Sequence, residues 1–138
     1  MKYTLQEEYD FGFTLIGISC HAKDYRVCWS INRRLGFELE KQKDDLEMVG
    51  PGNEEPSKHS LFSYYDEVDK NEYILICNRN GQGFLIPEER NSDFMLMVKG
   101  AIPVDANKLS KELKEIEQVL TALPINVNTL KSKKNLIF

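Results

Sequence analysis

The side chains best suited to metal binding or nucleophilic chemistry are three cysteines and two histidines, and their spacing argues against both uses. Cys20 and His21 are adjacent, and adjacent residues of a strand point to opposite faces of a sheet. Structural zinc sites usually take four ligands, often from Cys-x-x-Cys pairs, which this chain lacks. Cys28 and Cys77 lie in apolar stripes, where cysteine behaves as a small buried hydrophobic residue. We therefore predict no metal site and no cofactor, and the sequence offers no support for a Cys20–His59 dyad.

Acidic residues gather in two segments, and acid–base catalysis would need two carboxylates in different environments. The first segment, residues 66–72, is typical of a solvated turn. In the second, Pro87 fixes the backbone before Glu88, an apolar run precedes it, and Asp93 follows. Glu88 and Asp93 are candidate ligand- or partner-binding residues, although a turn cap or a structural salt bridge is the favoured interpretation. We predict no catalytic residue in either segment.

An aromatic stripe on the first predicted helix is a further candidate for a binding surface. Tyr25, Trp29 and Asn32 stand at i, i+4 and i+7, so they share one side of a helix. Core packing with polar tips near the surface would explain this stripe, and so would a surface that faces a ligand or a partner. Trp29 is the only tryptophan of the chain, and tryptophan is enriched at binding hot spots.

The composition is ordinary for a soluble globular protein. A chain of 138 residues fits one domain and is long enough to bury a core without disulfides. Hydrophobic residues make up 41% and charged residues 29%, and the net charge of −4 disfavours nucleic-acid binding, which needs a basic face. The polar N-terminus does not resemble a secretion signal, and no apolar run approaches the length of a membrane span. We expect a cytoplasmic protein with reduced thiols and no membrane association.

Strand patterns dominate the chain and are clearest between Tyr73 and Val98. Apolar runs bounded by turn residues predict strands at residues 11–19, 60–65, 73–77, 84–89 and 93–98. The last three of these follow one another directly as antiparallel strands, with a tight turn at Asn80-Gly81. Residues 37–48 show a mixed, half-exposed pattern.

Two apolar stripes at helical spacing predict two helices. The first covers Asp24–Leu35, with Asp24 as its N-cap and Gly36 just past its end. The second covers Asp105–Leu123 and carries the strongest pattern of the chain, since its apolar residues keep helical spacing throughout. Asp105 is its predicted cap, and Pro124 ends it.

The remaining segments complete the predicted domain. Residues 49–58 are rich in glycine and proline, which predicts a flexible loop, and residues 125–138 fit either a last strand or a tail. We predict one α+β domain over residues 1–138, with a mainly antiparallel sheet of about five to six strands and two helices packed on one face. This order resembles the helix-grip fold, which encloses a pocket between a sheet and a long C-terminal helix, and a two-layer sandwich without a pocket fits equally well.

Several short motifs together resemble the IPExxDY family of bacterial proteins. The matching residues are Asp10-Phe11, Leu15 to Ile18, Asp24 to Asn32, Asn78-Arg79, Leu85 to Glu88, and Asp93-Phe94. In this chain four residues separate Glu88 from Asp93, and Phe94 stands where the family name has tyrosine. That family has no established activity. The resemblance therefore implies a small cytoplasmic bacterial protein and assigns no catalytic residue.

Two functional hypotheses follow. The first is a non-catalytic domain that binds another protein, or a second copy of itself as a homodimer, through a sheet edge or the Tyr25–Trp29 face. The second is a small-molecule-binding domain of helix-grip type, with a pocket between the sheet and the predicted helix at 105–123. An enzyme that uses Glu88 or Asp93 ranks third, and nucleic-acid binding ranks last.

Overall fold

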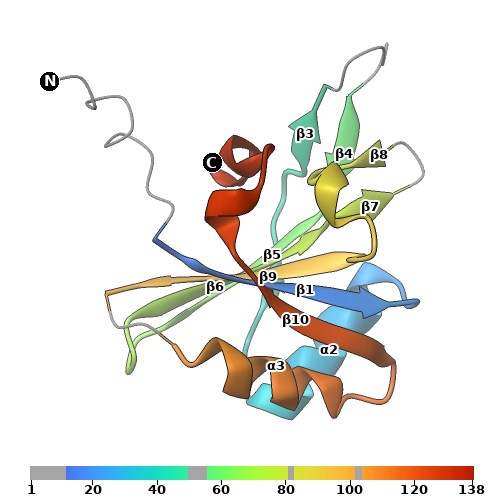
Figure 1. Cartoon of the computed structure of the whole chain (residues 1–138). Coiled ribbons are helices and arrows are strands. Elements are labelled where there is room, and N and C mark those ends of the chain that lie inside the picture. Colours follow the sequence, from blue (N-terminus) through green and yellow to red (C-terminus); the bar gives the residue numbers. More distant parts are fainter. Residues whose placement is uncertain (1–11, 50–55, 81–82, 102–103) are drawn as a thin grey trace, which may run out of the picture.

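One antiparallel sheet organises the chain (Figure 1). The computed structural model describes residues 12–49, 56–80, 83–101 and 104–138. The sheet has six strands in the order β10-β1-β9-β6-β5-β2. In chain order these are β1 (Thr14–Cys20), β2 (Glu40–Lys41), β5 (Leu61–Asp66), β6 (Asn71–Cys77), β9 (Phe94–Gly100) and β10 (Val119–Ile125). All neighbouring strands are antiparallel, which confirms the predicted α+β class.

Both helices pack on the same face of this sheet, below it in Figure 1, as predicted. Val27 and Ile31 of α2 (Asp24–Leu35) and Leu113 of α3 (Ala106–Lys114) enter one buried cluster with the sheet. Ile16 and Leu96 meet them from the central strands and are fully buried. The apolar stripes that predicted the helices are thus the surfaces that the helices bury.

The bounds of α2 agree with the predicted helix, and its C-terminal end has the expected chemistry. Gly36 has a φ of 71°, and its N–H donates to the Asn32 carbonyl. Glycine adopts this left-handed conformation without the steric penalty of a side chain. The predicted N-cap is wrong by one residue, because Lys23 is the cap and Asp24 is the first helical residue. The Asp24 carboxylate still lies at the positive end of the helix dipole.

The predicted second helix is wrong beyond residue 114, where α3 ends. Asp105 caps α3 as predicted, and its carboxylate accepts a hydrogen bond of 3.1 Å from the Lys108 N–H. The chain then forms β10, which pairs with β1 across an irregular register. The irregularity buries Val119 and Ala122, three residues apart, so this strand imitates helical spacing. Pairing with a distant strand has outweighed the local helical pattern.

Hairpins and short 3-10 turns cover the other face of the sheet, above it in Figure 1. They are the hairpin of β3 (Leu46–Met48) with β4 (Ser57–His59), that of β7 (Arg79–Asn80) with β8 (Gly83–Phe84), and the turns η1 (Pro87–Glu89), η2 (Val127–Thr129) and η3 (Lys133–Leu136). Val127, Leu130 and Leu136 are buried against the sheet. Residues 126–138 are therefore neither a strand nor a loose tail, which corrects both alternatives.

The segment from Tyr73 to Val98 contains two strands of the main sheet, not three. β6 and β9 pair directly with each other, and the run between them forms the β7–β8 hairpin and η1. The hairpin connection, residues 81–82, lies outside the described residues. Asn78 explains the departure, because its buried side chain accepts from the Ile86 N–H at 2.7 Å and donates to backbone carbonyls farther along. Side-chain bonds here replace a strand ladder.

Other predicted bounds shift by a few residues. β1 begins at Thr14 and β5 covers Leu61–Asp66, and only Glu40–Lys41 of the mixed segment before β3 pairs with the main sheet. Of the predicted loop at 49–58, residues 57 and 58 belong to β4, whereas residues 50–55 lie outside the described part of the chain. Within the described residues, no helix combines the length and apolar character needed to cross a membrane.

Candidate functional site

α2 presents an exposed tryptophan between two arginines of its own helix. Trp29 is 50% exposed, although it stands in the middle of α2. Arg26 lies one turn before it and Arg33 one turn after it, and their guanidinium carbons lie 5.3 Å and 5.4 Å from the centroid of the Trp29 ring. The negative face of an aromatic ring attracts a guanidinium group at such distances. The three side chains therefore form one aromatic and basic strip along the helix.

A surface groove of about 620 Å³ runs beside this strip, and we call it the Trp29 groove. Its other wall is the turn between α3 and β10. The lining residues are Arg26, Trp29, Ser30, Arg33, Arg34, Ile116, Glu117 and Gln118. The Ser30 hydroxyl donates to Gln118 Oε1 at 3.4 Å, which joins the two walls.

Of the three arginines that line the Trp29 groove, only Arg34 forms ion pairs with described residues. Arg34 forms ion pairs of 3.4 Å with Glu112 and 3.2 Å with Glu115. Neither Arg26 nor Arg33 forms an ion pair with any residue that the structure describes. Two uncompensated guanidinium groups thus face solvent on a chain whose net charge is −4. Guanidinium groups bind carboxylates and phosphates in a two-pronged geometry, and the indole offers an apolar surface between them.

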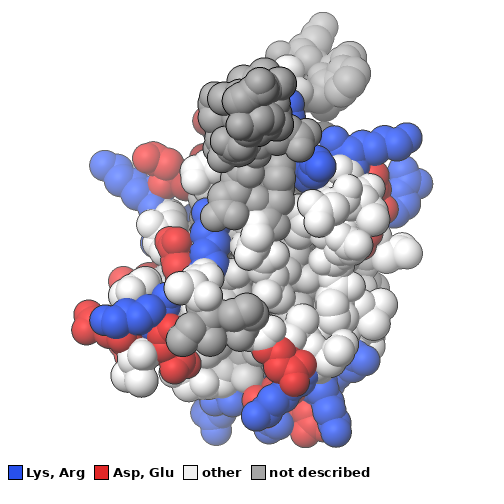
Figure 2. Space-filling model, turned by 60° about the vertical axis from the view of Figure 1, so that its left-hand side comes forward, with Lys and Arg blue, Asp and Glu red and all other residues white. Residues whose placement is uncertain are grey.

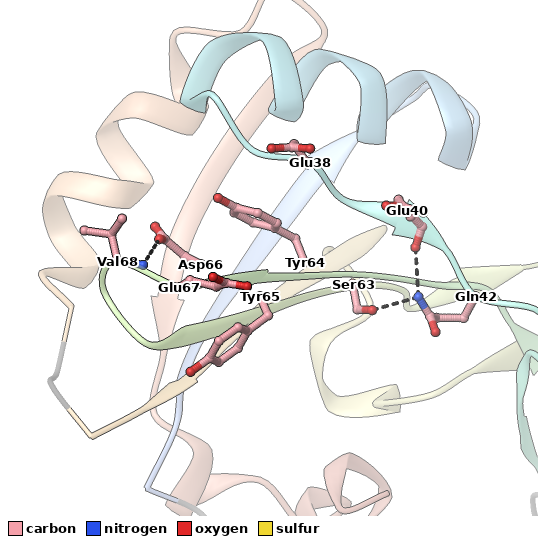
Figure 3. Close-up of a pocket in the computed structure, with 9 residues that line it drawn as sticks. All are labelled: Glu38, Glu40, Gln42, Ser63, Tyr64, Tyr65, Asp66, Glu67 and Val68. Carbon is pink, nitrogen blue, oxygen red and sulfur yellow. Dashed lines mark hydrogen bonds between the residues drawn. The ribbon is translucent and has the colours of Figure 1, made fainter.

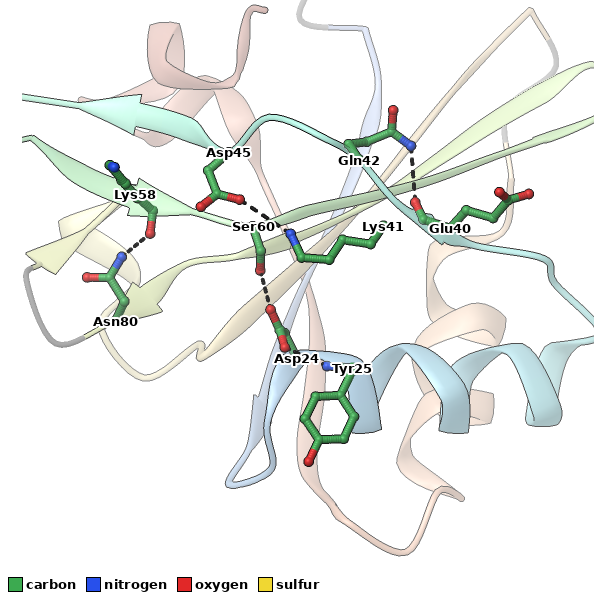
Figure 4. A network of polar contacts seen from close by, with 9 residues as sticks. All are labelled: Asp24, Tyr25, Glu40, Lys41, Gln42, Asp45, Lys58, Ser60 and Asn80. Carbon is green, nitrogen blue, oxygen red and sulfur yellow. Dashed lines mark hydrogen bonds and ion pairs between the residues drawn. The ribbon is translucent and has the colours of Figure 1, made fainter.

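Tyr25 extends the exposed aromatic surface toward the start of α2 (Figure 4). Its backbone N–H donates to Asp24 Oδ1 at 2.6 Å, and Asp24 Oδ2 accepts from the Ser60 hydroxyl at 2.7 Å. These bonds tie the first turn of α2 to the residue before β5. The Tyr25 ring points away from the polar network in Figure 4, so its phenol is open to solvent.

Asn32, the third residue of the predicted stripe, is engaged inside the protein. Its side chain accepts from the Leu39 N–H at 2.9 Å and donates to the Leu39 carbonyl at 3.1 Å. These two hydrogen bonds fix the position of the backbone just after α2. The structure therefore brings Tyr25 and Trp29 to the surface together and turns Asn32 inward, and a binding role of Asn32 stays a prediction.

Glu88 joins η1 to the C-terminal segment. Its two carboxylate oxygens accept from the Ser132 N–H at 2.7 Å and the Ser132 hydroxyl at 2.8 Å. Partial burial alone would raise the pKa of Glu88, but these hydrogen bonds outweigh it and lower the pKa below its ordinary value. This is the geometry of a cap, and any further role of Glu88 in binding remains a prediction.

Asp93 is buried where β1, β7 and β9 meet. Asp93 Oδ2 accepts from the Cys20 N–H at 2.9 Å, and Asp93 Oδ1 pairs with the guanidinium of Arg79 at 2.9 Å. The carboxylate therefore satisfies a backbone donor at the end of β1 and a positive charge on β7. A binding role of Asp93 likewise stays a prediction, since both of its oxygens already have partners.

Cys20, His21 and Cys77 line one surface pocket together with Asp93, whereas His59 is held elsewhere. His59 Nδ1 lies 2.8 Å from the Cys77 carbonyl, and His59 Nε2 lies 2.8 Å from the Ser57 hydroxyl, so neither nitrogen is left for Cys20. Ser57 and His59 are only 3% and 0% exposed, which leaves no path for a substrate to this serine–histidine pair. Burial raises the pKa of Cys20 above its ordinary value and raises that of Cys77 to about 11, so both thiols stay protonated at neutral pH.

No group of three or more His, Cys, Asp or Glu side chains within the described residues is placed to hold a metal ion. The Trp29 groove is the site that sequence reasoning only half identified. Arg26 and Arg33 were detectable from their spacing of three and four residues around Trp29. Gln118 was not, because its place in the groove depends on the fold of β10.

No family model and no curated protein matches this chain. The resemblance to the IPExxDY family therefore remains a prediction that rests on the short motifs alone.

Proposed function

We propose that this protein is a non-catalytic protein-binding domain that binds its partner through the Trp29 groove. The observation that carries the proposal is a half-exposed tryptophan flanked by two guanidinium groups that lack ion-pair partners within the described residues. Tryptophan and arginine are the side chains most enriched at energetic hot spots of protein interfaces. The complementary partner carries a carboxylate next to an apolar side chain.

The geometry of the groove supports a protein partner over a free small anion. An anion alone would use Arg26 and Arg33 but would leave the apolar face of Trp29 in water. A protein segment covers all three and removes the indole from solvent.

Site-specific photo-crosslinking tests the proposal in cells. A benzophenone amino acid at Tyr25 should capture a partner, whereas the same group at Val49, exposed just past the end of β3 and outside the Trp29 groove, should not. The captured protein, once purified, should bind the Trp29→Ala variant about 30-fold or more weakly than the unchanged protein, as for a hot-spot residue. Arg33→Ala should also weaken binding, and Leu120→Ala serves as a control outside the groove. Equal affinity of the Trp29→Ala and unchanged proteins for every captured partner would refute the proposal.

Self-association through β10 is a second candidate, favoured by a separate observation. Residues 119–130 contain no charged side chain, and Leu120 and Leu123 are 66% and 57% exposed. Figure 2 shows a broad area without charged side chains on one face of the molecule. An uncharged apolar patch is complementary to itself, as a two-fold dimer requires. Sedimentation velocity should detect a dimer that Leu123→Glu dissociates, and a monomer at all concentrations would remove this candidate.

The small-molecule alternative has less support. It rests on a long C-terminal helix over a pocket, whereas α3 ends at Lys114 and its Leu113 is fully buried against the sheet. The three free cysteines support a reducing compartment such as the cytoplasm.

A further inference from the structure

The edge of the main sheet at β5 is only partly covered. β2 pairs with β5 at two positions, Glu40 with Ser63 and Lys41 with Phe62. Beyond Glu40 the chain leaves β5, because Asn32 at the end of α2 holds the Leu39 backbone by two hydrogen bonds. The second half of β5 therefore lies at an edge without a neighbouring strand on that side among the described residues.

The backbone groups at this edge point outward. The Leu61 carbonyl accepts from the Gln42 N–H at 2.8 Å, so Leu61 faces the β2 side of β5. Because alternate residues of an antiparallel strand face the same neighbour, Ser63 and Tyr65 face that side too. Ser63 meets Glu40, but β2 does not reach Tyr65. The N–H and the carbonyl of Tyr65 consequently point past the end of β2, with no backbone partner there among the described residues.

A groove of about 570 Å³ opens at the same place (Figure 3). Glu38, Glu40 and Glu67 line it, and none of their carboxylates forms an ion pair with a described residue. Asp66 also borders the groove, but its carboxylate already accepts from the Val68 N–H at 2.9 Å. The unpaired charges of the groove are therefore all negative, and the three glutamates are the carboxylates with no hydrogen bond of their own among the described contacts.

Two tyrosines give the two sides of the edge different characters. Figure 3 shows Tyr64 on the side of α2 and Tyr65 on the opposite side of β5. The Tyr64 ring packs against Phe37, with ring centroids 5.4 Å apart, so it is partly buried against the core. Tyr65 is 53% exposed. An added strand would place alternate side chains toward Glu38 on one side and toward the Tyr65 ring on the other.

We propose that the β5 edge, defined as Tyr64 to Glu67 with Glu38 and Glu40, binds an extended protein segment that carries lysine or arginine and adds to the sheet as a further strand. The exposed backbone of Tyr65 supplies the strand pairing, and the three free glutamates select a basic segment. This surface and its ligand differ from those of the Trp29 groove, so either proposal can fail without the other.

A capped hexapeptide in which lysine and valine alternate is the probe. Added to the full chain, it should bind saturably, and the hydrogen exchange of the Tyr65 amide, followed by NMR, should slow at least tenfold. The glutamate–valine peptide and a lysine–valine peptide with methylated backbone nitrogens should not bind. Spermine separates simple charge attraction from strand pairing, because it carries positive charge without a peptide backbone.

Variants of the chain separate the contribution of backbone pairing from that of charge attraction. Tyr65→Pro removes the ring and an N–H that the sheet does not use. Because proline is tolerated on an edge strand, the protein should fold, as circular dichroism would confirm, and should lose the peptide. Tyr65→Ala keeps that N–H and should bind within about threefold of the unchanged protein. Glu38→Gln and Glu67→Gln should each weaken binding about two- to fivefold, as for surface ion pairs. Trp29→Ala should leave peptide affinity unchanged.

Three results would overturn the proposal. The first is absence of saturable binding at millimolar peptide. The second is protection of the Tyr65 amide by spermine as strong as by the peptide. The third is unchanged affinity of a folded Tyr65→Pro variant.

Discussion

Asn78 holds together the segment between β6 and β9, and we predict that Asn78→Ala destabilises the protein by about 3 kcal/mol. Its fully buried side chain accepts from the Ile86 N–H at 2.7 Å and donates to the carbonyls of Glu89 at 3.0 Å and Ser92 at 2.8 Å. Each hydrogen bond contributes about 1 kcal/mol net, so three give about 3 kcal/mol. The Ile86 N–H would be left buried without its partner, which adds to the loss.

Urea unfolding, followed by the fluorescence of Trp29, measures the free energy of unfolding. The control is Asn126→Ala, since Asn126 is exposed and accepts a single cap bond of 3.1 Å from the Asn128 N–H. We expect that control to lose at most about 1 kcal/mol. Asn78→Asp keeps the acceptor but loses both donors, and should be at least as harmful as alanine because it buries a charge. A loss below about 1 kcal/mol for Asn78→Ala would refute the role of these bonds.

Three further predictions concern single contacts. Glu88→Gln should lose about 1 kcal/mol at neutral pH. Folding lowers the pKa of Glu88 from its ordinary value of 4.5, so this contribution is fully present above pH 4.5 and is lost as the pH falls through the lowered pKa. The thermal unfolding temperatures of the Glu88→Gln variant and the unchanged protein should therefore converge in acid. The Cys77 thiol is partly buried, and its pKa is raised to about 11, so it should react with iodoacetamide at pH 8 about a hundredfold more slowly than a free cysteine. A free-cysteine rate by mass spectrometry would contradict the raised pKa. Gly17→Ala should cost about 2 kcal/mol in urea unfolding, because a Cβ there would overlap the Ser92 hydroxyl; unchanged stability would show that the neighbours move aside.

The elements that were predictable from sequence are those whose determinants are local. The apolar stripe of α2 and Gly36 lie within one short segment, and the predicted helix has the observed bounds. β10 was not predictable in this way, because its strand structure depends on pairing with β1, more than a hundred residues earlier in the chain. Leu120 and Leu123, expected on the buried side of a helix, are instead exposed on the sheet edge.

The candidate sites also differ in whether local sequence or long-range pairing determines them. Tyr25 and Trp29 were recognisable from the sequence, because helical spacing places them on one exposed side. The open edge at Tyr65 was not, since it exists only because β2 stops after two residues. The side chain responsible is Asn32, which was expected on the binding surface and instead binds the Leu39 backbone. A polar residue on a helix can thus shape a distant binding edge without touching a ligand.

The unpaired charges of the two proposed surfaces have opposite net signs, even with Glu117 counted beside Arg26 and Arg33 in the Trp29 groove, and this makes the surfaces separable. Arg26 and Arg33 attract acidic partners, whereas Glu38 and Glu67 attract basic ones. Arg34, on the same helix, forms ion pairs with Glu112 and Glu115. Arg26 and Arg33 lack such pairs because they lie farther from these glutamates along and around α2. Exposed charges are screened by salt, whereas burial of Trp29 is not. Added salt should therefore weaken binding of the basic peptide at the β5 edge strongly, and weaken a partner anchored on Trp29 far less.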